Sequence, residues 1–276
     1  MRGNEDQGRQ ADRLRVEEHF HDEWALHLKP EEVLVDESWS AATCPEHRWI
    51  RTQLGDVAGL RILDLGCGAG EAAVWFAKQG AHVTACDLSS EFLNLVSQVA
   101  ALHHVDVELH RADADSLLLP EGSFDVVYAG NLLHHVDVRT TLRRISDVLK
   151  PGGVLVSWDP LAHNPVINAY RRLANGVRTP GEHPLKLSDL RLFDEFFAEV
   201  RTEFFWLTTL ALFLRFFAIE RVHPSAQRYW KKIITEHERL TPQYNRLEKV
   251  DSVLLKWCPW LKRYCWNVAV IARKSK

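Results

Sequence analysis

Residues 61–70 read RILDLGCGAG, a short apolar run that ends in a carboxylate and a glycine-rich turn. Residues 71–80, EAAVWFAKQG, carry apolar side chains at helical spacing and close on a glycine, which predicts a helix. A strand, a glycine-rich turn and a helix in this order are typical of the ligand-binding corner of an open α/β sheet. This stretch therefore decides the fold class.

The same alternation of strand and helix continues beyond residue 80. Strands are predicted at 82–87, 105–113, 124–130 and 154–159, with a helix capped by Ser89 or Ser90 and another that runs through Leu149. Because these strands are nearly continuous in apolar residues, we expect a parallel sheet covered on both faces. Two more strands are predicted at 199–207 and 266–273. The expected fold is a doubly wound, mostly parallel α/β sheet of seven strands whose last strand is antiparallel.

The flanking segments differ in composition from this alternating region. Residues 1–58 are polar and predict an N-terminal helical cap, so the α/β sheet domain would span 59–276. Within it, residues 207–263 predict a helical insertion before the last strand. The insertion holds eleven Lys or Arg and five Asp or Glu, so it is net +6 while the rest of the chain is net -9.

Composition limits the function classes. The apolar share of 46% and charged share of 26% are ordinary for a globular protein, and the net charge of -3 gives no general attraction to nucleic acid. Five cysteines without a CxxC pair indicate a reducing compartment and no metal site. The N-terminus has no apolar signal region, and the apolar stretch 204–219 is too short to cross a bilayer. We therefore expect a cytoplasmic protein, with peripheral membrane contact as the alternative.

The residues around the glycine turn favour one kind of ligand. A dinucleotide fingerprint GxGxxG would place glycine at position 71, where this chain has Glu71. A pyrophosphate would also be repelled by Asp64 and Glu71, whereas a sulfonium ligand with an ammonium group would be attracted to Asp64. The turn therefore indicates an adenosyl sulfonium rather than a nicotinamide cofactor, and a nicotinamide oxidoreductase becomes a distant alternative.

Acidic and polar residues follow the next strands. Asp87 ends the second predicted strand, where its carboxylate can accept hydrogen bonds from ribose hydroxyls. Asp113 or Asp115 follows the third and can accept from an adenine amino group. The fourth strand delivers Asn131 to the same rim.

Taken together, these motifs resemble a known family. LDLGCGAG, the Asp87 tip, RADAD, GSFDVVYAGNLLHHV and LKPGGVLVSWDP occur in the order and spacing of the class I S-adenosylmethionine-dependent methyltransferases of the type 11, quinone-methylase-like group. The resemblance covers about residues 58–160 and implies S-adenosylmethionine as the cofactor. FHDEWA (20–25) also resembles the segment that lids the cofactor in these enzymes.

The resemblance assigns parts of the cofactor to particular residues. The methionine end would lie against the glycine turn, the ribose against the end of the second strand, and the adenine against Asp113 and Ala114. Because the step from Asp113 to Pro120 is longer than in the family, Asp115 is an alternative adenine contact. The expected cofactor-binding residues are Asp64, Gly66, Cys67, Gly68, Gly70, Asp87, Leu88, Asp113, Ala114 and Asn131.

Three residues are candidates for proton transfer from an acceptor. His134 and His135 follow the fourth strand and Asp159 ends the fifth, all at the edge where acceptors dock. The alternative is structural: the histidines shape the start of the next helix, and Asp159 is a turn residue before Pro160.

The acceptor is predicted only by class. Leu132 and Leu133 follow Asn131 in place of the proline-proline-aromatic run found in many enzymes that methylate amides or bases. This favours a small, hydrophobic or lipid-like acceptor methylated on oxygen or carbon over a protein or RNA. The apolar, aromatic and basic residues of 204–263 are consistent with a substrate lid, a peripheral membrane contact or a homodimer surface, and these alternatives stay open.

Overall fold

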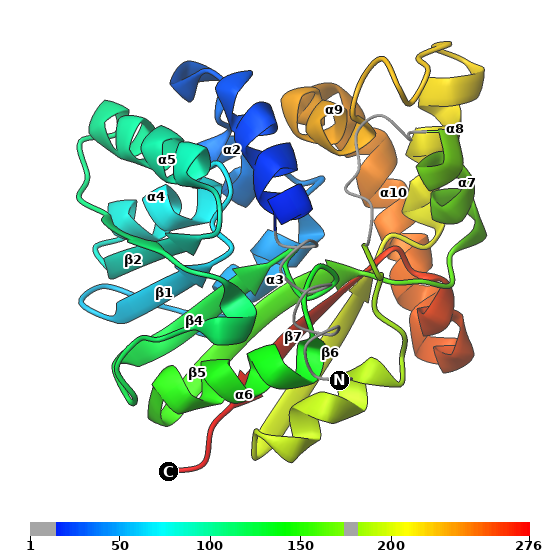
Figure 1. The fold of residues 1–276 in the computed structure, drawn as a ribbon. Coiled ribbons are helices and arrows are strands. Elements are labelled where there is room, and N and C mark those ends of the chain that lie inside the picture. Colours follow the sequence, from blue (N-terminus) through cyan, green and yellow to red (C-terminus); the bar gives the residue numbers. More distant parts are fainter. Residues whose placement is uncertain (1–14, 174–181) are drawn as a thin grey trace, which may run out of the picture.

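The computed structural model describes residues 15–173 and 182–276, which form a single β-sheet with helices on both faces (Figure 1). The strands are β1 (Arg61–Leu65), β2 (His82–Asp87), β3 (Glu108–Arg111), β4 (Phe124–Gly130), β5 (Leu149–Pro160), β6 (Glu199–Phe205) and β7 (Asn267–Arg273). Their order in the sheet is β3-β2-β1-β4-β5-β7-β6. β1 to β5 pair in parallel, and β7 lies antiparallel between β5 and β6. The predicted fold is confirmed.

Strand order reverses between β1 and β4, which places a ligand site there. β1 has β2 on one side and β4 on the other, so the loops that leave β1 and β4 diverge. Open α/β sheets bind ligands beyond the carboxyl ends of the strands at such a switch point. The glycine turn that follows β1 therefore lies at the expected place.

The two faces of the sheet are packed by different helices. Successive side chains of a strand point to opposite faces. Tyr128 of β4 packs on the face covered by α4 (Glu71–Lys78) and α5 (Ser90–Leu102), and its neighbour Val127 packs on the face of α6 (Val138–Val148). α5 begins as expected, because Ser89 Oγ accepts a hydrogen bond from Phe92 N at 3.0 Å.

The N-terminal helices cover the face of α4 and α5. Residues 15–26 are helical and are followed by η1 (Pro30–Glu32), α2 (Val35–Ser40) and α3 (Pro45–Leu54). Trp39 of α2 is fully buried and stacks on Trp75 of α4, with ring centroids 4.0 Å apart. The predicted helical cap is thus present, although its residues 1–14 lie outside the described part of the chain.

Four predicted strands have different bounds; β6 and β7 differ by one or two residues at one end, and β3 and β5 differ more. β3 contains only four of the predicted residues 105–113, because it is an edge strand that pairs with β2 over residues 108–111. β5 begins five residues earlier than predicted, so the turn expected at 150–153 lies inside the strand as a bulge opposite β4. Gly152 takes a φ of +75°, which allows this bulge.

The insertion is helical, as predicted. After α7 (Pro165–Leu173), η4 (Asp189–Glu195) and β6, it forms η5 (Thr208–Leu210), α8 (Ala211–Ala218), α9 (Tyr229–Thr235), α10 (His237–Trp257) and η6 (Pro259–Tyr264). It has its own apolar cluster, in which Phe213 packs against Tyr229. Among the described residues, no helix is both long enough and apolar enough to traverse a bilayer.

Candidate active site

The glycine turn is held against the end of β2 by backbone hydrogen bonds. Gly66 N and Cys67 N both donate to the Cys86 carbonyl, at 2.7 and 3.0 Å. Gly68 N donates to Asp87 Oδ2 at 2.9 Å. Gly66 has a φ of +72°, and a Cβ there would stand 2.7 Å from a methyl carbon of Leu132. The turn therefore needs glycine for its conformation and for its close contact with the loop after β4.

A cavity of about 630 Å³ opens beside this turn. It is bounded by the carboxyl ends of β1, β2 and β4, by the N-terminal helices and by the insertion. Nine of the ten predicted cofactor-binding residues line it: Asp64, Gly66, Cys67, Gly68, Asp87, Leu88, Asp113, Ala114 and Asn131. Gly70 does not; it caps the N-terminus of α4 with a φ of +89°.

Asp64 places a carboxyl group without a counter-charge at the cavity wall. Asp64 is 1% exposed. Burial raises the pKa of its carboxyl group to about 8, although a hydrogen bond from the backbone of Ala73 lowers that pKa. Oδ2 has no hydrogen-bond partner within the described residues. Since a buried carboxylate is costly unless it is paired, the site is suited to a cationic ligand.

Asp87 is held rigidly at the end of β2. Its Oδ1 accepts from Ser89 N and its Oδ2 from Gly68 N, both at 2.9 Å. Burial raises the pKa of Asp87, and these backbone hydrogen bonds oppose the shift. Each carboxylate oxygen has a second lone pair, so Asp87 can still accept hydrogen bonds from a ligand.

The structure distinguishes between the two candidate adenine contacts. Asp113 lines the cavity and caps the short helix η2 (Ala114–Ser116) by accepting from Asp115 N at 3.1 Å. Asp115 is absent from the cavity lining and accepts from Thr141 Oγ1 of α6 at 2.6 Å. The geometry therefore leaves Asp113 as the carboxylate that faces the cavity.

Only one of the three candidate proton-transfer residues faces the cavity. His135 lines it, with Nδ1 3.6 Å from Glu17 Oε1. His134 and Asp159 do not line it; His134 Nδ1 lies 2.9 Å from Asp159 Oδ1, and the backbone N of His134 donates to the same oxygen at 3.2 Å. Asp159 is fully buried, and burial raises its pKa well above the usual value. The pair ties the loop after β4 to the end of β5, and Asp159 lies within β5 rather than in a turn.

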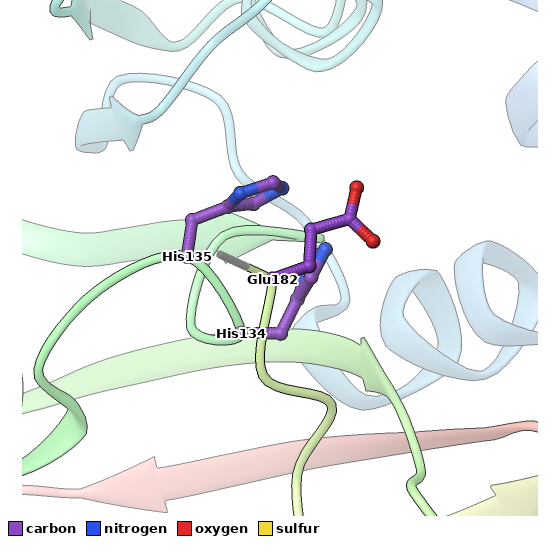
Figure 2. A group of neighbouring side chains, drawn as sticks. All are labelled: His134, His135 and Glu182. Atoms are coloured by element: carbon purple, nitrogen blue, oxygen red, sulfur yellow. The ribbon is translucent and has the colours of Figure 1, made fainter. Parts of the chain in front are cut away.

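His134, His135 and Glu182 form a cluster, called here the His–Glu cluster (Figure 2). One potential ligand atom from each residue lies within 4.8 Å of the others. The histidines come from the loop after β4, and Glu182 comes from the segment that leads to Leu185. Two imidazoles and a carboxylate are a composition that zinc accepts. The sequence predicted no metal, and this absence remains a prediction.

A hydrogen-bonded aromatic wall extends the cavity away from the glycine turn. Trp158 Nε1 donates to Tyr128 Oη at 2.8 Å. His47 Nδ1 donates to the Ser38 carbonyl at 2.7 Å, so the neutral ring presents Nε2 as an acceptor to the Tyr128 hydroxyl at 3.1 Å. Burial lowers the pKa of His47 to about 4, which keeps this ring neutral.

Beyond this wall lies a buried polar pair that sequence reasoning missed. Glu46 Oε1 of α3 accepts from Asn267 Nδ2 of β7 at 2.7 Å, and both residues line the cavity. They are 221 positions apart in the chain, so no local spacing joins them. Only the pairing of β7 between β5 and β6 brings Asn267 to the carboxyl edge of the sheet.

The cap and the insertion meet at the cavity. Arg228, just before α9, stacks its guanidinium 3.9 Å from the ring centroid of Trp24, and both side chains line the cavity. Thr43 Oγ1 donates to the Ile233 carbonyl of α9 at 2.6 Å. The cavity is therefore enclosed by segments from both ends of the described chain.

Comparison with known proteins agrees with this geometry. Residues 63–157 match a family model described as "Methyltransferase domain". A solved structure of an S-adenosylmethionine-dependent methyltransferase from Mesorhizobium loti is 26% identical, with a TM-score of 0.55, and the match covers 83% of this chain and 97% of that one. This chain carries a class I methyltransferase domain. The resemblance inferred from residues 58–160 is confirmed.

Curated relatives match the methyltransferase domain over part of their length. The ubiquinone biosynthesis O-methyltransferase of Aromatoleum aromaticum is 38% identical over 111 residues, which are 38% of this chain and 45% of that protein. The protein of the same name from Bordetella avium is 33% identical over 153 residues, or 51% of this chain and 63% of its own length. The chain thus spans about half the length of these relatives.

Proposed function

We propose that the protein is an S-adenosylmethionine-dependent methyltransferase that acts on a small, hydrophobic acceptor at oxygen or carbon. The observation that carries the cofactor assignment is Asp64, a buried carboxyl with an oxygen that has no partner among the described residues. A ligand with an ammonium group and a sulfonium matches this charge. A nicotinamide dinucleotide would instead bring its pyrophosphate to the two carboxylates Asp64 and Glu71.

The residues of the glycine turn fit the rest of the cofactor. A Cβ placed at Gly68 would have no protein atom within 4 Å, so the backbone there is open to a ligand. We assign Asp64 to the amino group, Asp87 to the ribose hydroxyls and Asp113 to the adenine amino group. When bound, the cofactor supplies a methyl carbon activated by the adjacent sulfonium.

The contribution of the chain to the reaction is then alignment and exclusion of water. Methyl transfer needs the acceptor atom in line with the bond that breaks, and well-oriented intramolecular reactions reach effective molarities of roughly 10⁵–10⁸ M. The contacts between Arg228 and Trp24 and between Thr43 and Ile233 join the cap to the insertion beside the cavity, and we propose that they help to exclude water from it.

A hydrophobic acceptor is supported by the cavity lining and by the relatives. Six tryptophans line the cavity: Trp24, Trp39, Trp158, Trp206, Trp230 and Trp266. The curated relatives are named for O-methylation in ubiquinone biosynthesis, whose products are small molecules.

The insertion supports a lid role because α9 contributes Ile233 and Ile234 to the cavity. It also exposes apolar residues elsewhere, including Ile219 (74% exposed) and Trp257 (76% exposed). With its net charge of +6, this surface supports the proposal of peripheral contact with an anionic membrane. Co-sedimentation with anionic vesicles tests that contact, and light scattering without vesicles tests the alternative of a homodimer.

Two measurements test the proposed function. Titration calorimetry should detect S-adenosylhomocysteine binding and no NADH binding; the reverse result would overturn the cofactor assignment. Transfer of labelled methyl into an extract of the source cells, followed by solvent partition, tests the acceptor class. Label in the organic layer is expected, and label in precipitated protein or RNA would contradict the small-molecule proposal.

A further inference from the structure

The end of the cavity opposite the glycine turn contains hydrogen-bond acceptors and aromatic rings. Trp158, Trp206 and Trp266 line this end. Among them lie the carboxyl of Glu46 and the side-chain amide of Asn267, which are 6% and 3% exposed. Such a combination is typical of a ligand pocket in which a few polar groups orient an apolar ligand.

Asn267 has a polar atom that its surroundings leave unpaired. It is the first residue of β7, and its backbone is fixed between Pro160 of β5 and Phe205 of β6. Its Nδ2 donates to Glu46 Oε1 at 2.7 Å, the orientation that an ionised carboxylate requires. Oδ1 is buried and has no hydrogen-bond partner within the described residues. Because a buried unpaired acceptor is costly, this atom is suited to a ligand that donates a hydrogen bond.

Glu46 is equipped to gain and lose a proton near neutral pH. Burial raises its pKa to about 7, while hydrogen bonds from Asn267 and Trp206 oppose the shift. The charge of Arg48, whose guanidinium is paired with Glu248 of α10, also lowers the pKa of Glu46. A general base is most effective when its pKa lies near the working pH.

The position of the pair relative to the cofactor end fits an acceptor site. The charges of Asp64 and Glu46 both raise the pKa of Tyr128, and all three residues line the one cavity. The hydroxyl of Tyr128 is held by His47, the residue next to Glu46 on α3. Tyr128 is thus close enough to both the proposed cofactor site and the polar pair for their charges to act on it.

We infer that Glu46 and Asn267 bind the hydroxyl group of an aromatic acceptor, and that Glu46 takes the hydroxyl proton when the methyl group is transferred. This inference rests on the proposed function. The O–H bond of the acceptor breaks and its proton passes to Glu46. An electron pair of the acceptor oxygen forms the bond to the methyl carbon, and the sulfur of S-adenosylmethionine keeps the electron pair of the sulfur–methyl bond. Asn267 keeps Glu46 ionised and its Oδ1 orients a further donor on the ligand.

The test uses 4-nitrophenol as the probe, because its phenolate absorbs visible light and reports binding and ionisation without the cofactor. Glu46→Gln keeps the shape and an oxygen that can accept from Asn267 but cannot take a proton. We expect the wild-type protein to bind the probe and the variant to bind it at least tenfold more weakly, with a methylation rate lower by about 10²-fold or more. Glu37→Gln, on the exposed surface of α2, is the matched control and should change neither quantity.

Asn267→Ala supplies a second, independent readout. It removes a hydrogen bond that lowers the pKa of Glu46, so the rise of the methylation rate with pH should move to higher pH. A purely structural role would lower the rate equally at every pH. Circular dichroism and the affinity for S-adenosylhomocysteine, both expected to be unchanged, show that the fold and the cofactor site are intact.

The outcomes separate the inference from the proposed function. If the wild-type protein binds S-adenosylhomocysteine but 4-nitrophenol binds Glu46→Gln and the wild type equally, the inference is wrong and the proposed function stands. If 4-nitrophenol does not bind the wild-type protein, the inference is also wrong. If S-adenosylhomocysteine does not bind, the proposed function itself fails.

Discussion

Replacement of Asp64 by asparagine should stabilise the protein without ligand and weaken the cofactor site. Burial raises the pKa of Asp64 from 3.8 to about 8 in the folded chain. The folded state therefore holds a proton that the unfolded state releases between about pH 4 and pH 8, and stability falls as pH rises through this window. The pKa of 3.8 in the unfolded chain lies about 3 units below pH 7. At about 1.4 kcal/mol per unit, the burial of Asp64 therefore lowers the free energy of unfolding at pH 7 by about 4 kcal/mol. Asparagine removes this cost.

Urea unfolding followed by tryptophan fluorescence measures the effect. At pH 7 the free energy of unfolding of Asp64→Asn should exceed that of the wild type by about 4 kcal/mol, and at pH 4 the two proteins should be nearly equal. Saturating S-adenosylmethionine should stabilise the wild type more than the variant, because only the Asp64 carboxyl can release its proton and present a charge to the ammonium group. The exposed Asp106→Asn is the control and should leave the unfolding free energy unchanged at both pH values. Equal stability of Asp64→Asn and wild type at pH 7 would refute the reasoning.

Three further predictions concern Asp87, the glycine turn and the His–Glu cluster. Asp87→Ala should weaken S-adenosylhomocysteine binding by tenfold or more in titration calorimetry, since hydrogen bonds to a charged acceptor contribute roughly 1.5–3 kcal/mol each; unchanged affinity would contradict the ribose assignment. Gly70→Ala should lower the free energy of unfolding by about 1–3 kcal/mol, because residue 70 has a φ of +89° and a Cβ there would stand 2.9 Å from Val96; a variant as stable as the wild type would show that the turn relaxes. Treatment with EDTA should leave the methylation rate unchanged, because a sulfonium methyl needs no Lewis acid; a loss that Zn²⁺ restores would assign the His–Glu cluster as a metal site.

The sequence predicted the sheet well where its signals are local. β1, β2 and β4 have the predicted bounds, because each is an apolar run that ends at a glycine or an aspartate. β5 was predicted too short because Pro151, Gly152 and Gly153 normally end a strand, and only the register opposite β4 shows that they form a bulge. Such a bulge depends on the neighbouring strand, which local sequence does not describe.

The sequence brought together residues that line one end of the cavity, and it missed those at the far end. Asp64 and the glycines after it are contiguous, so their spacing carries the information. Glu46, Tyr128 and Asn267 come from a helix and two strands, and only the assembled sheet joins them. His134 and Asp159 were placed at the correct edge, yet they turn toward each other rather than into the cavity, which residue type alone does not reveal.

The position of β7 in the sheet has a consequence for how the chain is made. β7 is the last of the seven strands to leave the ribosome, yet it lies between β5 and β6. Until it emerges, β5 presents a long unpaired edge and β6 has no neighbour in the sheet, and such edges invite pairing with other chains. The nascent polypeptide is therefore most exposed to aggregation while residues 161–266 are synthesised, and a chain that stops before β7 would also lack Asn267.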